Sequence, residues 1–238
     1  MIVLTVDQRG STRAGDNVPD LLLRLESWTR GRAGLNLAFE RTVGDEVQGV
    51  LDGTADGAEL AVDLTLDLLR DQGWSVGIGV GSVELPLPKV SRDARGPAFY
   101  RARDAVERAK SRAKGVSVAV EGPGGAGGSS RAREIESLLR LLGAIRARRT
   151  PQGWEAADTL ASLADRPGRQ KIAAQALGIS EQAVSQRVRA ALWQEEEGVR
   201  PVVVRLLAEL AEQGGATSSA PDGATEDDVH DERGDLEP

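Results

Sequence analysis

The amino-acid sequence predicts an α+β protein in which a sheet-containing N-terminal part precedes an all-helical C-terminal part. In roughly the first 120 residues, apolar positions alternate between the spacing of strands and the spacing of helices. A Gly/Ser run at 122–130 interrupts this pattern, and beyond it the apolar positions keep helical spacing only. From residue 214 onward the chain is polar and acidic.

These breaks divide the chain into four segments. Residues 1–121 are expected to form the sheet-containing domain, 122–130 a linker, 131–213 a helical domain and 214–238 a disordered acidic tail. The linker reads GPGGAGGSS and offers no large apolar side chain for packing. The tail has too few apolar residues to offset the entropy that is lost on ordering.

Each element of the N-terminal domain follows from its local pattern. The expected strands cover residues 2–6, 35–43, 47–51, 74–83 and 116–120. The expected helices cover residues 18–30, 57–70 and 98–109. Gly44, Asp45 and Glu46 are typical of a tight turn and join the second strand to the third. The order βαββαβ, followed by one more helix and strand, predicts a ferredoxin-like or palm-type sheet covered by helices.

The C-terminal domain is predicted to be entirely helical. Its helices are expected at residues 131–148, 155–164, 170–177, 181–193 and 199–212. Pro167 and Gly168 separate the second of these helices from the third.

Residues 170–189, QKIAAQALGISEQAVSQRVR, fit two short helices that cross at a wide angle. Ala174 is small where the helices would touch, Gly178 tolerates the positive φ of a turn, and Ser180 can cap the second helix. An inward apolar face is supplied by Ile172, Leu177, Ile179, Val184 and Val188. The segment therefore predicts a helix-turn-helix, and it resembles those of bacterial regulators and sigma-factor-like domains. A plain helical hairpin with a glycine turn is the alternative.

A helix-turn-helix implies double-stranded DNA as the partner. Gln and Arg side chains read base edges through paired hydrogen bonds, and basic side chains hold phosphates. The candidate DNA-binding residues are Arg169, Lys171, Ser180, Glu181, Gln182, Ser185, Gln186, Arg187 and Arg189. The run from Arg146 to Arg149 could hold further phosphates or be a solvated helix end.

The charge of the chain is unevenly distributed. The formal net charge is −7, yet residues 131–193 hold 11 basic against 6 acidic residues. Residues 215–238 hold 8 acidic residues and 1 Arg. This asymmetry indicates a basic binding module beside an acidic appendage.

Three motifs of the N-terminal domain suggest a second site. They are VDQRGST at 6–12, TVGDEVQGVL at 42–51 and GIGVGSV at 77–83. Gly10, Ser11 and Thr12 would open a helix, whose free N–H groups can bind an anion. Asp7 at a strand end and Asp45 on a hairpin tip would face one another and could hold Mg²⁺. Taken singly, each of these residues is more simply a turn or capping residue, and only the joint pattern favours a site.

At these residues the domain resembles the class III nucleotide cyclase fold. The strand-end Asp followed by Gly and Ser/Thr, and the Gly-Asp hairpin of that family, match Asp7, Gly10, Thr12, Gly44 and Asp45. GDEV is also similar to part of the diguanylate cyclase signature, with Val43 where that signature has another Gly. Residues 1–120 as a whole resemble the SatD family of bacterial proteins.

The resemblance carries expectations for ligands as well as for fold. It implies a nucleotide at Gly10, Ser11, Thr12 and Gly44 and Mg²⁺ at Asp7 and Asp45. The chain departs from the cyclases at Tyr100 and Asp104, where that family has the Asn and Arg that stabilise the transition state. No catalytic residue is therefore assigned.

The composition excludes several classes of protein. The chain has no cysteine and a single histidine, His230 in the acidic tail. Disulfides, thiolate chemistry and a histidine-based triad or metal cage within one chain are therefore excluded. No apolar run approaches the ~18 residues of a membrane span, and the first residues lack the pattern of a signal peptide. A cytoplasmic protein with no membrane partner is expected.

Three functions are compatible with these patterns. The first is a DNA-binding transcriptional regulator whose cyclase-like domain is non-catalytic and senses a nucleotide or mediates dimerisation. The second is a Mg²⁺-dependent nucleotidyl cyclase or related nucleotide-processing enzyme that the helical domain regulates. The third is a dimeric scaffold. A homodimer is expected for the first because paired DNA half-sites favour two-fold symmetry.

Overall fold

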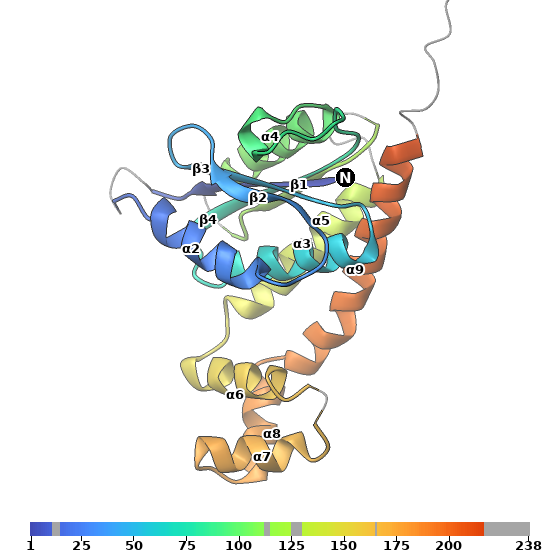
Figure 1. Cartoon of the computed structure of the whole chain (residues 1–238). Helices are drawn as coiled ribbons and strands as arrows, with labels where there is room; N and C mark the ends of the chain where they lie inside the picture. The colour runs from blue at the N-terminus through green and yellow to red at the C-terminus, as the bar shows by residue number, and fades with distance from the viewer. Residues whose placement is uncertain (11–14, 112–114, 125–129, 165, 217–238) are drawn as a thin grey trace, which may run out of the picture.

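A computed structural model of the chain describes residues 1–10, 15–111, 115–124, 130–164 and 166–216. It confirms the α+β class, because a five-stranded mixed sheet is covered by helices on both faces (Figure 1). Further helices project from one end of this assembly (Figure 1). No helix within these ranges is long and apolar enough to cross a membrane.

The sheet contains all five strands that the sequence predicts. They are β1 (Ile2–Gln8), β2 (Leu35–Arg41), β3 (Glu46–Leu51), β4 (Trp74–Val80) and β5 (Val118–Glu121). Their order across the sheet is β2-β3-β1-β4-β5. β1 is antiparallel to both of its neighbours, β2 is antiparallel to β3, and β5 is parallel to β4. Because β1 is central, every residue of it is buried.

The two faces of the sheet are covered differently. Helices α2 (Val18–Thr29) and α3 (Ala55–Leu68) lie on one face, and α4 (Pro97–Lys110) lies on the other (Figure 1). Alternate residues of β1 point to the two faces, so Leu4 joins the core under α3 whereas Val3 joins the core under α4.

Helix α4 packs unusually close to the sheet, and the glycines of the GIGVG strand allow it. A Cβ on Gly77 would come within 2.5 Å of the Ala102 carbonyl oxygen, and one on Gly79 within 2.2 Å of the Ala98 carbonyl oxygen. The helix meets these glycines with small side chains such as Ala102 and Ala105, which are fully buried. The close approach of α4 to the sheet therefore accounts for this glycine pattern without a ligand.

Two further helices complete the main hydrophobic core. They are α5 (Ser130–Arg146) and α9 (Trp193–Ala216). The side chains that they bury in that core include Ile135, Leu139, Leu142, Val203, Leu207 and Leu210. The sequence assigns both helices to a separate domain at 131–213, whereas the structure packs them against the sheet domain. Helical periodicity reveals that a helix has an apolar face, but not which partner covers it. The sheet with α2 to α5 and α9 is called the sheet body below.

The remaining helices form a small unit that projects from the sheet body (Figure 1). They are α6 (Pro151–Ala161), α7 (Arg169–Leu177) and α8 (Glu181–Ala190), and they are called the helical module. The module has its own core, which consists of Ala156, Ala157, Leu160, Leu163, Ala173, Ala174, Val184, Val188 and Trp193. Only the last of these residues comes from α9.

The break between the last two helices differs from the prediction. The sequence predicts helices at 181–193 and 199–212, whereas α8 ends at Ala190 and α9 runs through Pro201 to its end. The break falls at Leu192, whose φ of 50° lies outside the helical region. Residues 214–216 of the predicted tail belong to α9. The rest of that tail, 217–238, and residues 125–129 of the predicted linker lie outside the described residues.

Candidate nucleic-acid interface

The connection between α7 and α8 has the local geometry that its sequence predicts. Gly178 ends α7 with φ 64° and ψ 30°, a left-handed conformation that glycine adopts without strain. The Ile179 N–H donates to the Ala174 carbonyl oxygen at 3.0 Å and closes the turn. Ser180 then caps α8, since its Oγ accepts a hydrogen bond from the Ala183 N–H at 3.1 Å.

Helix α8 has one buried face and one exposed face. Val184 and Val188 are 0% and 5% exposed within the core of the module. The exposed residues of α8 include Glu181, Gln182, Gln186 and Arg189. Lys171, on α7, is exposed as well. The side chains of Gln182, Gln186 and Arg189 make no hydrogen bond or ion pair with any residue that the structure describes.

Other candidate DNA-binding residues are engaged within the module. Arg187 Nη1 lies 3.0 Å from Glu155 Oε2 of α6, and the Arg169 guanidinium lies 5.1 Å from the centroid of the Trp193 ring. Ser185 donates to the Glu181 carbonyl oxygen at 3.0 Å and also contacts Gln170. These contacts hold the three helices together, so these side chains are less free to reach a ligand than Gln182 or Arg189.

The arginine run at the end of α5 is not a phosphate clamp. Arg146 and Arg149 have side chains only 10% and 2% exposed, and both pair with Glu196 of α9. Arg148 is exposed. Arg146 and Arg149 are therefore neither phosphate contacts nor a solvated helix end, because Glu196 of α9 packs against them.

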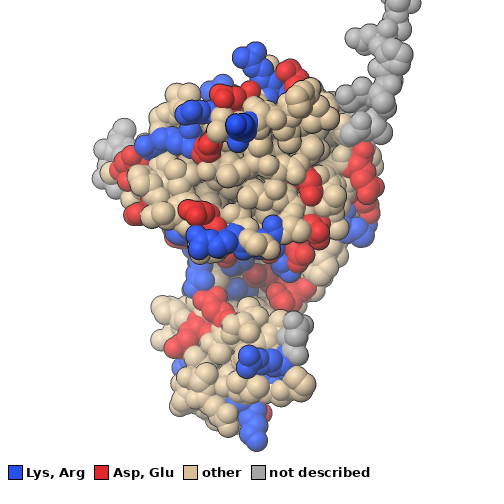
Figure 2. All heavy atoms as spheres, in the orientation of Figure 1, with Lys and Arg blue, Asp and Glu red and all other residues tan. Residues whose placement is uncertain are grey.

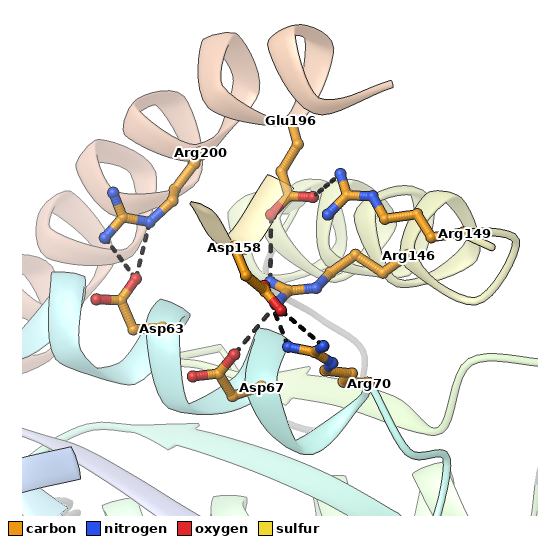
Figure 3. Close-up of polar contacts among 8 residues, drawn as sticks. All are labelled: Asp63, Asp67, Arg70, Arg146, Arg149, Asp158, Glu196 and Arg200. Carbon is orange, nitrogen blue, oxygen red and sulfur yellow. Dashed lines mark hydrogen bonds and ion pairs between the residues drawn. The ribbon is translucent and has the colours of Figure 1, made fainter. Parts of the chain in front are cut away.

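These buried arginines belong to a cluster of ion pairs that lies where the module meets the sheet body (Figure 3). Glu196 accepts from Arg146 Nη1 at 3.2 Å and from Arg149 Nη2 at 2.5 Å. Arg146 Nη2 also lies 3.2 Å from Asp67 Oδ1 of α3. The junction ion pairs, as we call them, are Arg70–Asp158, Arg146–Asp67, Arg146–Glu196 and Arg149–Glu196.

Trp154 of α6 lies at the centre of the junction. The guanidinium carbons of Arg70, Arg146 and Arg149 lie 3.9, 5.0 and 4.9 Å from the centroid of its ring, within cation–π range. Burial raises the pKa of the Asp67 carboxyl, although Arg146 acts in the opposite direction. The junction therefore fixes the module to the body by electrostatic contacts around one aromatic ring.

The surface of the projecting module differs from that of the junction (Figure 2). In this view the acidic side chains of the module lie mostly toward the sheet body. Basic and uncharged side chains make up most of its outer end, where little acidic surface is visible (Figure 2). A polyanion can therefore approach the outer end with less repulsion than it would meet near the junction.

The carboxylate of the first N-terminal motif is already paired. Asp7 is 8% exposed on the α4 face of the sheet, and its Oδ2 lies 2.8 Å from Lys110 Nζ. Burial raises the pKa of Asp7, with hydrogen bonding to Lys110 lowering it and the charge of Asp45 raising it further. Asp7 pairs with Glu46 across β1 and β3, so Asp45 is one residue away from the strand partner of Asp7.

The hairpin tip lines a different surface from Asp7. A shallow hollow of about 420 Å³ is lined by Gln8, Gly15, Asp16, Arg41, Gly44 and Asp45. Gly44 has a φ of 62° and forms the expected turn, and Gly10 has a φ of 69°. Asp7 does not line this hollow. Ser11 and Thr12 lie outside the described residues, and no group of three metal-ligating side chains occurs within the part that the structure describes.

Sequence reasoning finds the α8 surface but misses the junction. Arg70 and Asp158 are 88 positions apart, and Arg146 and Asp67 are 79 apart. No local pattern links such partners; the only local signal is the unusual density of Arg near Trp154. Comparison with protein-family models, with curated proteins and with solved structures finds no match to the chain.

Proposed function

We propose that the protein is a cytoplasmic DNA-binding transcriptional regulator in which α7 and α8 form a helix-turn-helix. α8 is the recognition helix and enters the major groove. The observation that carries the proposal is the two-sided character of α8: Val184 and Val188 are buried, whereas the opposite polar face is exposed on a projecting module. A plain helical hairpin also exposes a polar face, and the proposal is favoured because Gln182, Gln186 and Arg189 on this face are of the types that read base edges.

The free side chains match the chemistry of base edges and phosphates. Gln182 and Gln186 can form paired hydrogen bonds to adenine, and Arg189 can do so to guanine. In this proposal the exposed Lys171 contacts phosphate, and the N-terminus of α8 adds the favourable end of its dipole. Glu181 can accept from cytosine. These assignments make direct base readout the source of sequence preference.

We further propose that the sheet is of the ferredoxin-like or palm type found in nucleotide cyclases. The antiparallel order β2-β3-β1-β4, with α2 and α3 on one face, supports this assignment. In this proposal the sheet body is non-catalytic and senses a ligand or mediates homodimerisation. Two modules related by a two-fold axis would then read paired half-sites.

The experiment is selection of bound fragments from genomic DNA, followed by fluorescence anisotropy with the selected duplex across a range of salt concentrations. Affinity should fall steeply as salt rises, because phosphate contacts release counterions. The triple variant Gln182→Ala, Gln186→Ala, Arg189→Ala should lose its preference for the selected duplex over a scrambled one. Each lost base contact is worth about 1–3 kcal/mol of discrimination.

The matched control is Arg103→Ala, an exposed arginine on α4 of the sheet body. It should bind the selected duplex as the unmodified protein does. The assignment of α8 fails if the triple variant, shown to be folded by circular dichroism, keeps its sequence preference.

A Mg²⁺-dependent nucleotide enzyme is the second candidate. The hollow that contains Gly44 and Asp45 supports it, since this hollow adjoins the end of β1. Incubation with each nucleoside triphosphate and Mg²⁺ or Mn²⁺, followed by chromatography, tests it against the Asp45→Asn variant. A product that depends on Asp45 would favour this candidate, and the absence of both product and thermal shift would remove it.

A further inference from the structure

A second hollow lies on the sheet body beside the end of α5, and its lining residues differ from those of the hollow that contains Gly44 and Asp45. Its volume is about 240 Å³. Its apolar wall includes Leu69, Trp74, Val116, Gly143 and Ala144. Gly143 keeps the wall recessed, because a Cβ there would lie 2.6 Å from a methyl group of Val116.

The polar part of this hollow is cationic. Arg9 and Arg148 both line it, and no acidic residue does so within the part of the chain that the structure describes. Neither arginine forms an ion pair with a described residue, although Arg9 Nη1 donates to the Gln72 carbonyl oxygen at 3.3 Å. By contrast, the arginines at the junction are matched with Asp67, Asp158 and Glu196.

We infer that this hollow binds a small organic acid with an apolar body, whose carboxylate lies between Arg9 and Arg148. The apolar wall accommodates the body and the two guanidinium groups supply charge-assisted hydrogen bonds. The volume is below the ~300–1,000 Å³ of pockets for drug-sized ligands, so the ligand has a single ring or a short branched chain.

The position of the hollow also suggests how its occupant acts. Gly143 and Ala144 belong to the last turn of α5, and Arg148 follows that helix directly. The intervening Arg146 and the residue after Arg148, Arg149, contact the ring of Trp154 in the helical module and pair with Glu196 of α9. A ligand in the hollow therefore contacts the segment that carries the junction ion pairs and can change how the module is held. This regulatory part of the inference rests on the proposed DNA-binding function.

Binding is tested without DNA, by calorimetry and by ¹H–¹⁵N NMR of the tryptophan indole signals of the full chain. The probes are benzoate and phenylacetate, with benzamide and phenylacetamide as neutral analogues of the same shape. The acids should bind at least about tenfold more tightly than the amides, as expected for charge-assisted hydrogen bonds. The indole signal of Trp74 should shift on titration, whereas that of Trp193 in the module core should not.

Two variants localise the site. Arg148→Glu should weaken binding of the acids about tenfold or more, whereas Arg133→Glu, an exposed arginine on the first turns of α5, should leave it unchanged. Ala144→Leu should block binding of all four probes by filling the hollow. The inference is overturned if neither acid binds saturably, if the amides bind as tightly as the acids, or if Arg148→Glu leaves the affinity unchanged.

The effect of the ligand on DNA binding is tested by repeating the anisotropy measurement of DNA affinity in the presence of an acid that binds. The acid should change DNA affinity in the unmodified protein but not in Ala144→Leu. If DNA does not bind at all, the proposed function fails while the ligand titration stands. If DNA binds and the acid has no effect on its affinity, the coupling is refuted.

Discussion

The cores of the sheet body and of the helical module differ in the size of their side chains. The core of the body contains many fully buried large aliphatic side chains, such as Leu60, Ile78 and Leu139, on both sides of a sheet. Four of the nine core residues of the module are alanines, namely Ala156, Ala157, Ala173 and Ala174. Since stabilisation scales with buried apolar area, the module gains much less from its own core. The body is therefore the more stable unit, and the Arg70–Asp158 pair and the contacts of Trp154 at the junction fix the module to it.

The largest expected effect follows from breaking the junction. Glu196→Gln leaves the buried guanidinium of Arg149 without its ion-pair partner and leaves Arg146 paired with Asp67 alone, at a cost of about 3–5 kcal/mol. Hydrogen exchange should then show lost protection in α6 to α8, while β1 and β4 stay protected. Glu195→Gln, the exposed neighbour in the same turn, should leave exchange in both regions unchanged. Equal loss of protection in body and module would show that the two regions unfold together.

The second test asks whether α5 belongs to the body. Leu139→Ala removes a fully buried side chain of α5 and should cost about 2–5 kcal/mol in the free energy of unfolding of the sheet body. Leu141→Ala, on the same helix but 53% exposed, should change it by less than about 0.5 kcal/mol. Urea denaturation followed by far-UV circular dichroism measures both. Similar values for the two variants would mean that α5 is not part of the body core.

The third test concerns the close packing of α4. Gly79→Ala places a Cβ against the backbone of Ala98 and Ala102 and should destabilise the body by about 1–3 kcal/mol. Gly198→Ala, in α9 with open space around the new Cβ, should instead stabilise the protein by about 1 kcal/mol because alanine is the better helix former. Thermal unfolding distinguishes the two. If the Gly79→Ala protein were as stable as the original, close helix packing would not explain the glycines, and their role in a ligand site would have to be reconsidered.

The smallest expected effect is the pH dependence caused by Asp7. Burial raises its pKa, so the folded state binds this proton more readily than the unfolded chain does. The stability of the unmodified protein relative to Asp7→Asn should therefore fall as pH rises from the usual range of an aspartic acid to the raised pKa, and then level off. Urea denaturation between about pH 3 and pH 7 measures the difference. A difference that grows with pH would show that the ion pair with Lys110 outweighs burial.

Features that depend on residues close together in the sequence were predictable, whereas features that depend on distant residues were not. The strands and the α7–α8 turn were predictable because short apolar runs, two-residue alternation, the left-handed Gly178 and the capping Ser180 are local signals. The membership of α5 in the body core was not, since an apolar face does not specify its partner. The pairing of Arg149 with Glu196 was likewise inaccessible, because 47 positions separate these residues.

Photo-crosslinking from α8 is the most direct test of whether this helix contacts DNA. A benzophenone amino acid placed at Gln182 should crosslink to the selected DNA duplex, and one placed at the exposed Arg103 of the sheet body should not. Crosslinking from the α4 position but not from α8, or from neither position at protein concentrations that saturate the duplex, would contradict the assignment of α8 as the recognition helix.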